Sequence, residues 1–171
     1  MRNENQKNID TDEINKFDNL ASRWWDPEGD FKPLHQINPL RLDFICQYNN
    51  IKDLNIADIG CGGGILAEAM SKKGAVVTGV DMAEKALNVA KLHQMESKTT
   101  VNYQLSTAEE LSASKKECFD VVTCLEMLEH VPEPEAIVKS CANLLKPGGS
   151  VYFSTINKNL KSFLYAIIGA E

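Results

Sequence analysis

Short apolar runs alternate with amphipathic stretches from about residue 55 onward. The apolar runs are typical of strands that are buried on both faces, and the stretches between them have the spacing of helices. This alternation predicts an α/β fold, in which helices cover both faces of a mostly parallel sheet. The five predicted strands cover 55–60, 75–81, 101–105, 119–127 and 150–156.

Three helices are predicted between these strands. Their apolar positions fall within 65–70, 83–90 and 137–145. In a parallel sheet of this kind, a ligand binds beyond the carboxyl ends of the strands, where the strand order reverses. The chemistry is therefore expected just after the strands that end near Ile59, Val80, Leu105 and Cys124.

The N-terminal part of the chain has a different pattern. Ile14, Phe17 and Leu20 recur at a spacing of three, which weakly indicates a helix. We predict that residues 1–37 form an N-terminal helix and a lid-like segment. Residues 38–171 are expected to form the domain that contains the sheet.

Residues 23–37 are rich in aromatic residues, proline and glycine, and we predict an ordered loop there. Its Trp24 and Trp25 fit a lid over a site and plain packing equally well. A helix is expected to begin at Asn38 and Pro39, because asparagine caps helices and proline suits their first turn. The predicted buried stripe of this helix is Leu40, Phe44, Ile45 and Tyr48.

Composition and charge exclude several classes of protein. The 171 residues suit one domain, and 43% hydrophobic with 25% charged residues is ordinary for a globular protein. The net charge is −6, and no block of lysine and arginine is present, so we expect no nucleic-acid partner. The five cysteines form no C-x-x-C pair, and the polar N-terminus lacks the apolar stretch of a signal peptide. Both observations favour a reducing, cytoplasmic location.

A glycine-rich loop follows the first predicted strand, in the sequence DIGCGGG at 58–64. A dinucleotide site would need its third glycine at position 65, which is Ile65. Asp81 stands 21 residues after Gly60, at the end of the second strand. A carboxylate there can accept two hydrogen bonds from a vicinal diol. A simple glycine turn with a helix-capping aspartate is the alternative.

Glu126, Glu129 and His130 follow the fourth strand at spacings of three and four. On a helical turn these side chains would share one face. Two carboxylates and an imidazole can bind a divalent cation. The alternative is a polar helix start with His130 hydrogen-bonded to backbone.

Four segments together resemble the ubiquinone-biosynthesis O-methyltransferase family of class I S-adenosylmethionine-dependent methyltransferases, whose fold is Rossmann-like. These segments are RWWDPEGDFKPLHQINPLRL, IADIGCGGGILAEAM, TCLEMLEHVPEP and KPGGSVYFSTINKN. The resemblance runs from about residue 10 to residue 171. Sheets of this class usually have seven strands, so the chain is expected to be truncated after strand five.

The resemblance implies a cofactor, a metal and a role for seven residues. The cofactor S-adenosyl-L-methionine would contact Arg41, Gly60, Asp81 and Leu125, although Leu125 is often methionine or serine in relatives. Magnesium would bind Glu126, Glu129 and His130, and His130 and Glu129 would be catalytic.

The resemblance also implies a lipid substrate, a polyprenylated catechol or demethylubiquinol, and a possible ubiquinone-biosynthesis complex. Such a substrate requires contact with the inner membrane from the cytoplasmic side. Apolar residues at 163–168 follow Lys158 and Lys161, which suits an interfacial segment, and a helix packed on the sheet fits equally well. The other functions considered are methylation of a different small molecule, nicotinamide-dependent oxidoreduction and cofactor binding without catalysis.

Overall fold

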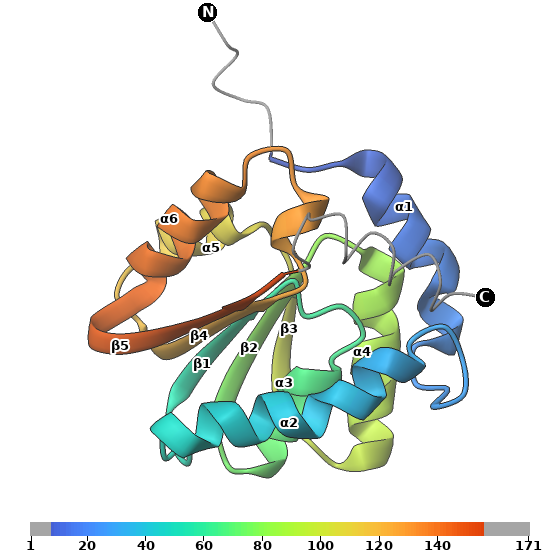
Figure 1. Ribbon diagram of the computed structural model, residues 1–171, viewed down its shortest axis with the longest axis horizontal. Helices are drawn as coiled ribbons and strands as arrows, with labels where there is room; N and C mark the ends of the chain where they lie inside the picture. The colour runs from blue at the N-terminus through green and yellow to red at the C-terminus, as the bar shows by residue number, and fades with distance from the viewer. Residues whose placement is uncertain (1–7, 156–171) are drawn as a thin grey trace, which may run out of the picture.

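The structure is a computed structural model, and it describes residues 8–155. Its centre is a five-stranded sheet with the order β3-β2-β1-β4-β5, in which every neighbouring pair is parallel (Figure 1). The predicted α/β architecture is therefore confirmed. The strands are β1 (Asn55–Ile59), β2 (Val76–Asp81), β3 (Val101–Leu105), β4 (Phe119–Leu125) and β5 (Leu145–Ser154).

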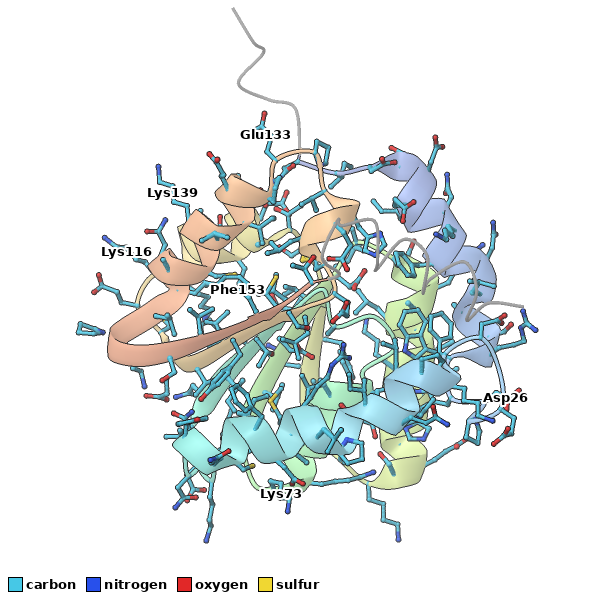
Figure 2. The ribbon with its side chains drawn as sticks, viewed as in Figure 1. Asp26, Lys73, Lys116, Glu133, Lys139 and Phe153 are labelled. Carbon is cyan, nitrogen blue, oxygen red and sulfur yellow. The ribbon has the colours of Figure 1, made fainter. Side chains whose placement is uncertain are left out.

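Helices cover both faces of the sheet (Figure 1). Helices α2 (Lys32–Tyr48), α3 (Ile65–Lys72) and α4 (Glu84–Ser97) cover one face, and α5 (Ala108–Ser114) and α6 (Pro134–Leu144) cover the other. Each face has its own apolar core, because strands of a covered parallel sheet are buried on both sides. Exposed charged side chains such as Lys73, Lys116 and Lys139 project outward from this layered body (Figure 2).

The predicted N-terminal helix is confirmed as α1 (Thr11–Leu20). The Asp10 side chain caps it by accepting hydrogen bonds from the backbone N–H groups of Asp12 and Glu13. A short 3-10 helix, η1 (Ala21–Arg23), follows. Figure 1 shows α1 beside α4, at the right of the view.

The predicted start of the next helix is wrong. Helix α2 begins at Lys32, inside the expected loop, and contains Pro39 in its interior. Pro33 occupies the first turn, where its missing N–H costs nothing. Packing of the helix therefore outweighs the roughly 3 kcal/mol that an interior proline costs. The helix also runs across position 37, where the two predicted parts of the chain were expected to meet.

The predicted buried stripe of α2 is also mostly wrong. Ile45 is 1% exposed, but Leu40, Phe44 and Tyr48 are 53–68% exposed. The helix carries two apolar stripes, and the one that contains Ile45 faces the sheet with Leu42. The sequence pattern does not decide between two such stripes.

Two further elements differ from the sequence expectations. Helix α5 was not predicted, although Thr107 and Glu110 form a capping box at its start. Strand β5 begins at Leu145, directly after α6, and not at position 150. Among residues 8–155, no helix is long and apolar enough to cross a membrane. The expected interfacial segment at 163–168 lies outside the described residues.

Candidate active site

A cavity of about 340 Å³ lies beyond the carboxyl ends of β1, β2 and β4, with α1 along one side. The strand order reverses between β1 and β4, so the cavity occupies the position where such sheets bind ligands. Its lining includes all seven residues predicted from the sequence: Arg41, Gly60, Asp81, Leu125, Glu126, Glu129 and His130. The structure thus brings these residues together, while their individual roles stay predictions.

The glycine-rich loop forms one wall of the cavity. Gly60, Gly62 and Gly64 all have positive φ angles, a conformation that glycine adopts without strain. Close packing also requires glycine at position 62, because a Cβ atom there would lie 2.2 Å from the Trp24 ring. The loop can therefore present backbone directly to a ligand.

Asp81 connects this loop to β2. Its carboxylate accepts hydrogen bonds from the backbone N–H groups of Gly62, at 2.7 Å, and Ala83, at 2.8 Å. Burial raises the pKa of Asp81, and these backbone hydrogen bonds act in the opposite direction. A carboxylate has about four acceptor sites, so it can still accept hydrogen bonds from the hydroxyls of a ligand.

Asp58 is a second carboxyl group in the cavity wall, and it is almost completely buried. Burial raises its pKa to about 7, with a smaller increase from the nearby Asp81. The hydroxyl of Thr123, which donates a hydrogen bond at 2.6 Å, and the positive charge of Arg41 lower it again. The cavity therefore has a carboxyl group that gains its charge near neutral pH.

Arg41 and Glu126 form an ion pair across the cavity, with 2.8 Å between Nη2 and Oε1. The same Glu126 oxygen accepts a hydrogen bond from the Ser154 hydroxyl at 2.7 Å. Glu126 has a φ angle of 54°, which is uncommon for a residue other than glycine and costs roughly 1–3 kcal/mol. The sharp turn after β4 directs this carboxylate toward Arg41.

The residues predicted to bind magnesium have separate partners in this structure. Glu129 accepts a hydrogen bond from Thr155 at 2.8 Å, and His130 Nδ1 lies 2.7 Å from a carboxylate oxygen of Glu13. The helical turn η2 (Leu128–His130) does not include Glu126. Within 8–155, no three His, Cys, Asp or Glu side chains converge to hold a metal ion. The arrangement thus does not fit a bound ion, and the magnesium site stays a prediction.

The two tryptophans pack against the glycine loop. Trp24 is buried and stacks on Phe31, with 3.9 Å between ring centroids. Trp25 donates a hydrogen bond from Nε1 to the Gly63 carbonyl at 2.9 Å. The two residues thus pack against the loop, and Trp24 also lines the cavity, so the structure agrees with both the packing and the lid interpretation.

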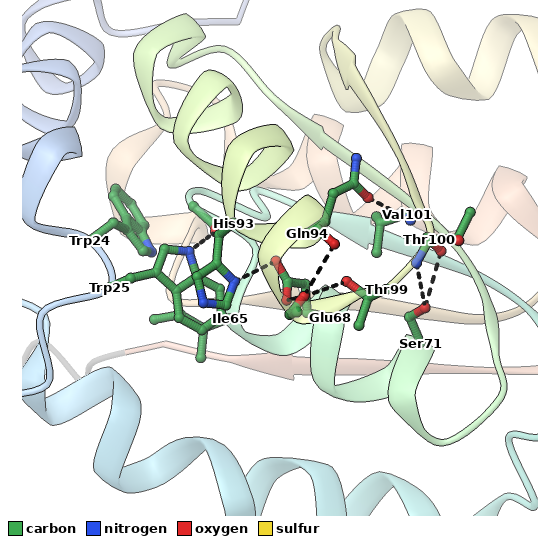
Figure 3. Close-up of polar contacts among 12 residues, drawn as sticks. Trp24, Trp25, Ile65, Glu68, Ser71, His93, Gln94, Thr99, Thr100 and Val101 are labelled. Atoms are coloured by element: carbon green, nitrogen blue, oxygen red, sulfur yellow. Dashed lines mark hydrogen bonds and ion pairs between the residues drawn. The ribbon is translucent and has the colours of Figure 1, made fainter.

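A hydrogen-bonded pair, His93 and the buried Glu68, supports Trp25 in turn (Figure 3). The Trp25 ring stacks on His93 with 3.4 Å between centroids, and His93 Nδ1 lies 2.9 Å from Glu68 Oε1. Ser97 donates a second hydrogen bond to the Glu68 carboxylate at 2.6 Å. Since Glu68 belongs to α3 directly after the loop, this network ties the loop to α4 and to the N-terminal segment.

Several cavity residues were not predicted from the sequence, chiefly Glu13, Ile14 and Phe17 of α1. The spacing of Ile14 and Phe17 indicated a helix but not its place over the cavity. No local pattern marks Glu13, because its partner His130 is 117 residues away in the sequence.

Comparison with known proteins identifies the family. The methyltransferase domain family matches residues 57–153, more than half of the chain. The ubiquinone biosynthesis O-methyltransferase of Vibrio vulnificus (strain YJ016) is 57% identical over 166 residues, which cover 96% of this chain and 71% of that protein. The protein of the same name from Idiomarina loihiensis is 58% identical over 167 residues, which cover 97% and 69%. The chain belongs to this family.

Membership confirms the resemblance of the sequence motifs. The chain spans about 70% of the length of these O-methyltransferases. Among solved structures, it resembles the magnesium protoporphyrin IX methyltransferase of Synechocystis PCC 6803 with bound SAH. The TM-score is 0.75 at 22% identity, over 94% of this chain and 78% of the other. At this identity the similarity shows the fold alone, and it confirms the predicted methyltransferase fold.

Proposed function

We propose that the chain transfers a methyl group from S-adenosyl-L-methionine to a phenolic hydroxyl of a polyprenylated catechol or demethylubiquinol in ubiquinone biosynthesis. One observation carries this proposal: a member of the O-methyltransferase family has all seven predicted site residues around one cavity. The volume of about 340 Å³ is within the range of small-molecule sites.

The glycine-rich loop and Asp81 would hold the cofactor. Backbone of Gly60 and Gly62, which line the cavity, would contact its methionine part, because glycine has no side chain of its own to hold a ligand away from the main chain. The Asp81 carboxylate would accept hydrogen bonds from the ribose hydroxyls. Arg41 and Leu125 line the same cavity and would complete the contacts.

The reaction needs an acceptor oxygen that is negatively charged or that loses its proton as it attacks. A phenol has a pKa of about 10, by analogy with tyrosine, so it is mostly protonated at neutral pH. His130 would accept the phenolic proton, the oxygen would attack the methyl carbon, and the electrons of the S–CH3 bond would remain on sulfur. A positioned base typically contributes roughly 10²–10⁴-fold to a rate. Glu129, next to this imidazole, is the other predicted catalytic residue.

Magnesium is proposed from the family motif, and no step above depends on it. Were Glu126, Glu129 and His130 to converge on an ion, it would supply charge that favours the phenolate. Titrating magnesium into the protein and following its thermal stability tests this directly. Stabilisation by magnesium that disappears in the triple alanine variant supports the site, and an unchanged melting temperature refutes it.

A polyprenylated substrate implies that the protein works at a membrane surface. We propose peripheral association with the inner membrane from the cytoplasm and a place in a ubiquinone-biosynthesis complex. Flotation with liposomes, with and without residues 158–171, tests the first point. Equal binding of both proteins would show that this segment has no role in membrane binding.

The decisive experiment for the function follows a labelled methyl group from S-adenosyl-L-methionine to a short-tailed catechol, with and without magnesium. Transfer supports the proposal. Binding of the donor without transfer would favour a non-catalytic cofactor-binding protein, and transfer only to other phenols would favour a different small-molecule acceptor. Stabilisation by NAD in place of the methyl donor would favour an oxidoreductase.

A further inference from the structure

Helix α1 directs two side chains at the imidazole of His130. A carboxylate oxygen of Glu13 lies 2.7 Å from Nδ1. Phe17, one turn further along α1, makes an edge contact with the imidazole, with 5.1 Å between ring centroids and 87° between ring planes. His130 is thus held from the α1 side by a polar and an apolar contact.

The position of α1 is fixed at both ends. At its N-terminal end, the Asn8 side chain donates to a carboxylate oxygen of Glu109 at 3.1 Å and to the Glu133 carbonyl at 2.9 Å, and it accepts from the Glu133 backbone N–H at 2.8 Å. At the other end, the Asp18 carboxylate accepts from the Lys85 backbone N–H at the start of α4, at 2.8 Å. The middle of the helix therefore has a defined place over the cavity.

We propose that Glu13 is a positioning residue that sets the tautomer of His130. A carboxylate only accepts hydrogen bonds, so the imidazole nitrogen that faces it must carry a proton. In the neutral ring the other nitrogen, Nε2, is then the acceptor. Among residues 8–155, Nε2 has no hydrogen-bond partner, and His130 lines the cavity. The basic nitrogen is therefore left for a ligand.

The arrangement couples α1 to the chemistry. Glu13 belongs to the N-terminal helix, whereas His130 belongs to the connection between β4 and α6. The imidazole is therefore correctly oriented only when α1 lies over the cavity. This consequence rests on the proposed methyl transfer, whereas the tautomer itself does not.

Nitrogen NMR of the histidine rings tests the tautomer in the full chain. The variant Glu13→Gln has nearly the same shape, but its amide can also donate a hydrogen bond to Nδ1. In the ring that carries a single proton, we expect wild-type His130 to hold it on Nδ1 and the variant to be a mixture of tautomers. Asp12→Asn is the matched control, since Asp12 is an exposed carboxylate in the same turn of α1. His93, which pairs with Glu68, is an internal reference.

Two results would overturn the proposal: an Nε2-protonated His130 in the wild type, or an unchanged tautomer in Glu13→Gln. In the methyl-transfer assay, we expect Glu13→Gln to lower kcat by about tenfold to a hundredfold with an unchanged KM for the donor, and Asp12→Asn to change neither. A parallel rise in KM would instead indicate a merely structural role for α1. If the wild type transfers no methyl group, the proposed function fails, and the NMR spectra still decide the role of Glu13.

Discussion

Replacing Asp58 with asparagine should change how stability depends on pH. Burial raises the pKa of Asp58 from its ordinary 3.8 to about 7, so the folded protein keeps a proton that the unfolded chain has released between these values. The stabilising contribution is fully present below about pH 4 and is lost as pH rises through about 7. The rise of this pKa from 3.8 to about 7 corresponds to about 4 kcal/mol of unfolding free energy.

Urea unfolding between about pH 5 and pH 8 measures the larger part of this loss, about 3 kcal/mol. The wild type should lose stability across that interval, and Asp58→Asn should lose much less, because its amide is neutral and still accepts the Thr123 hydrogen bond. Asp120→Asn is a suitable control. The Lys146 ammonium lowers the pKa of Asp120, so its contribution is lost only as pH falls into the acid range. If Asp58→Asn keeps the wild-type slope between pH 5 and pH 8, the argument from burial is wrong.

The same carboxyl group should affect cofactor binding. S-adenosyl-L-methionine is a cation at sulfur, and an ionised Asp58 in the cavity wall attracts positive charge. We expect donor affinity to rise as pH increases from about 6 to 8 in the wild type and to stay flat in Asp58→Asn. Equal profiles in the two proteins would place the cation away from this residue.

Two further substitutions test the loop. Gly62→Ala should lower the free energy of unfolding by roughly 2–4 kcal/mol in urea titrations, because its Cβ would overlap the Trp24 ring. Gly148 is the control: it also has a positive φ, but no atom lies within 4 Å of the position of a Cβ. Gly148→Ala should therefore cost only about 1–2 kcal/mol. Equal losses would mean that close packing is not the cause. Trp25→Phe should keep its stack but lose the hydrogen bond to Gly63, which costs about 1 kcal/mol in the same assay; a neutral result would show that the bond does not stabilise the loop.

The sheet could be predicted from the sequence because each strand is a short apolar run. Strand 101–105 was predicted with its observed bounds, and the others differ mainly at their ends. Helix α5 escaped the prediction because its sequence, AEELSAS, has little apolar periodicity. Only the capping box of Thr107 and Glu110 marks its start.

The candidate site, like the fold, could be predicted from the sequence only in part. Gly60 directly follows β1 and Asp81 ends β2, and the ends of these strands meet at one edge of a parallel sheet, so the sequence predicts that the two residues lie together. The pairing of Arg41 with Glu126 and the position of α1 depend on contacts between distant segments, which no local pattern encodes. For the same reason, the spacing of Glu126, Glu129 and His130 suggested one helical face, whereas the turn after β4 separates Glu126 from the others.

Calorimetric titration of S-adenosyl-L-methionine into the wild type and Asp81→Asn tests the central claim, that the cavity beside the glycine loop holds the methyl donor. One donor should bind per wild-type chain, and Asp81→Asn should bind it about tenfold to a hundredfold more weakly, as expected for lost hydrogen bonds to a charged group. A folded wild type that binds no donor, or equal affinities for the two proteins, would contradict the account.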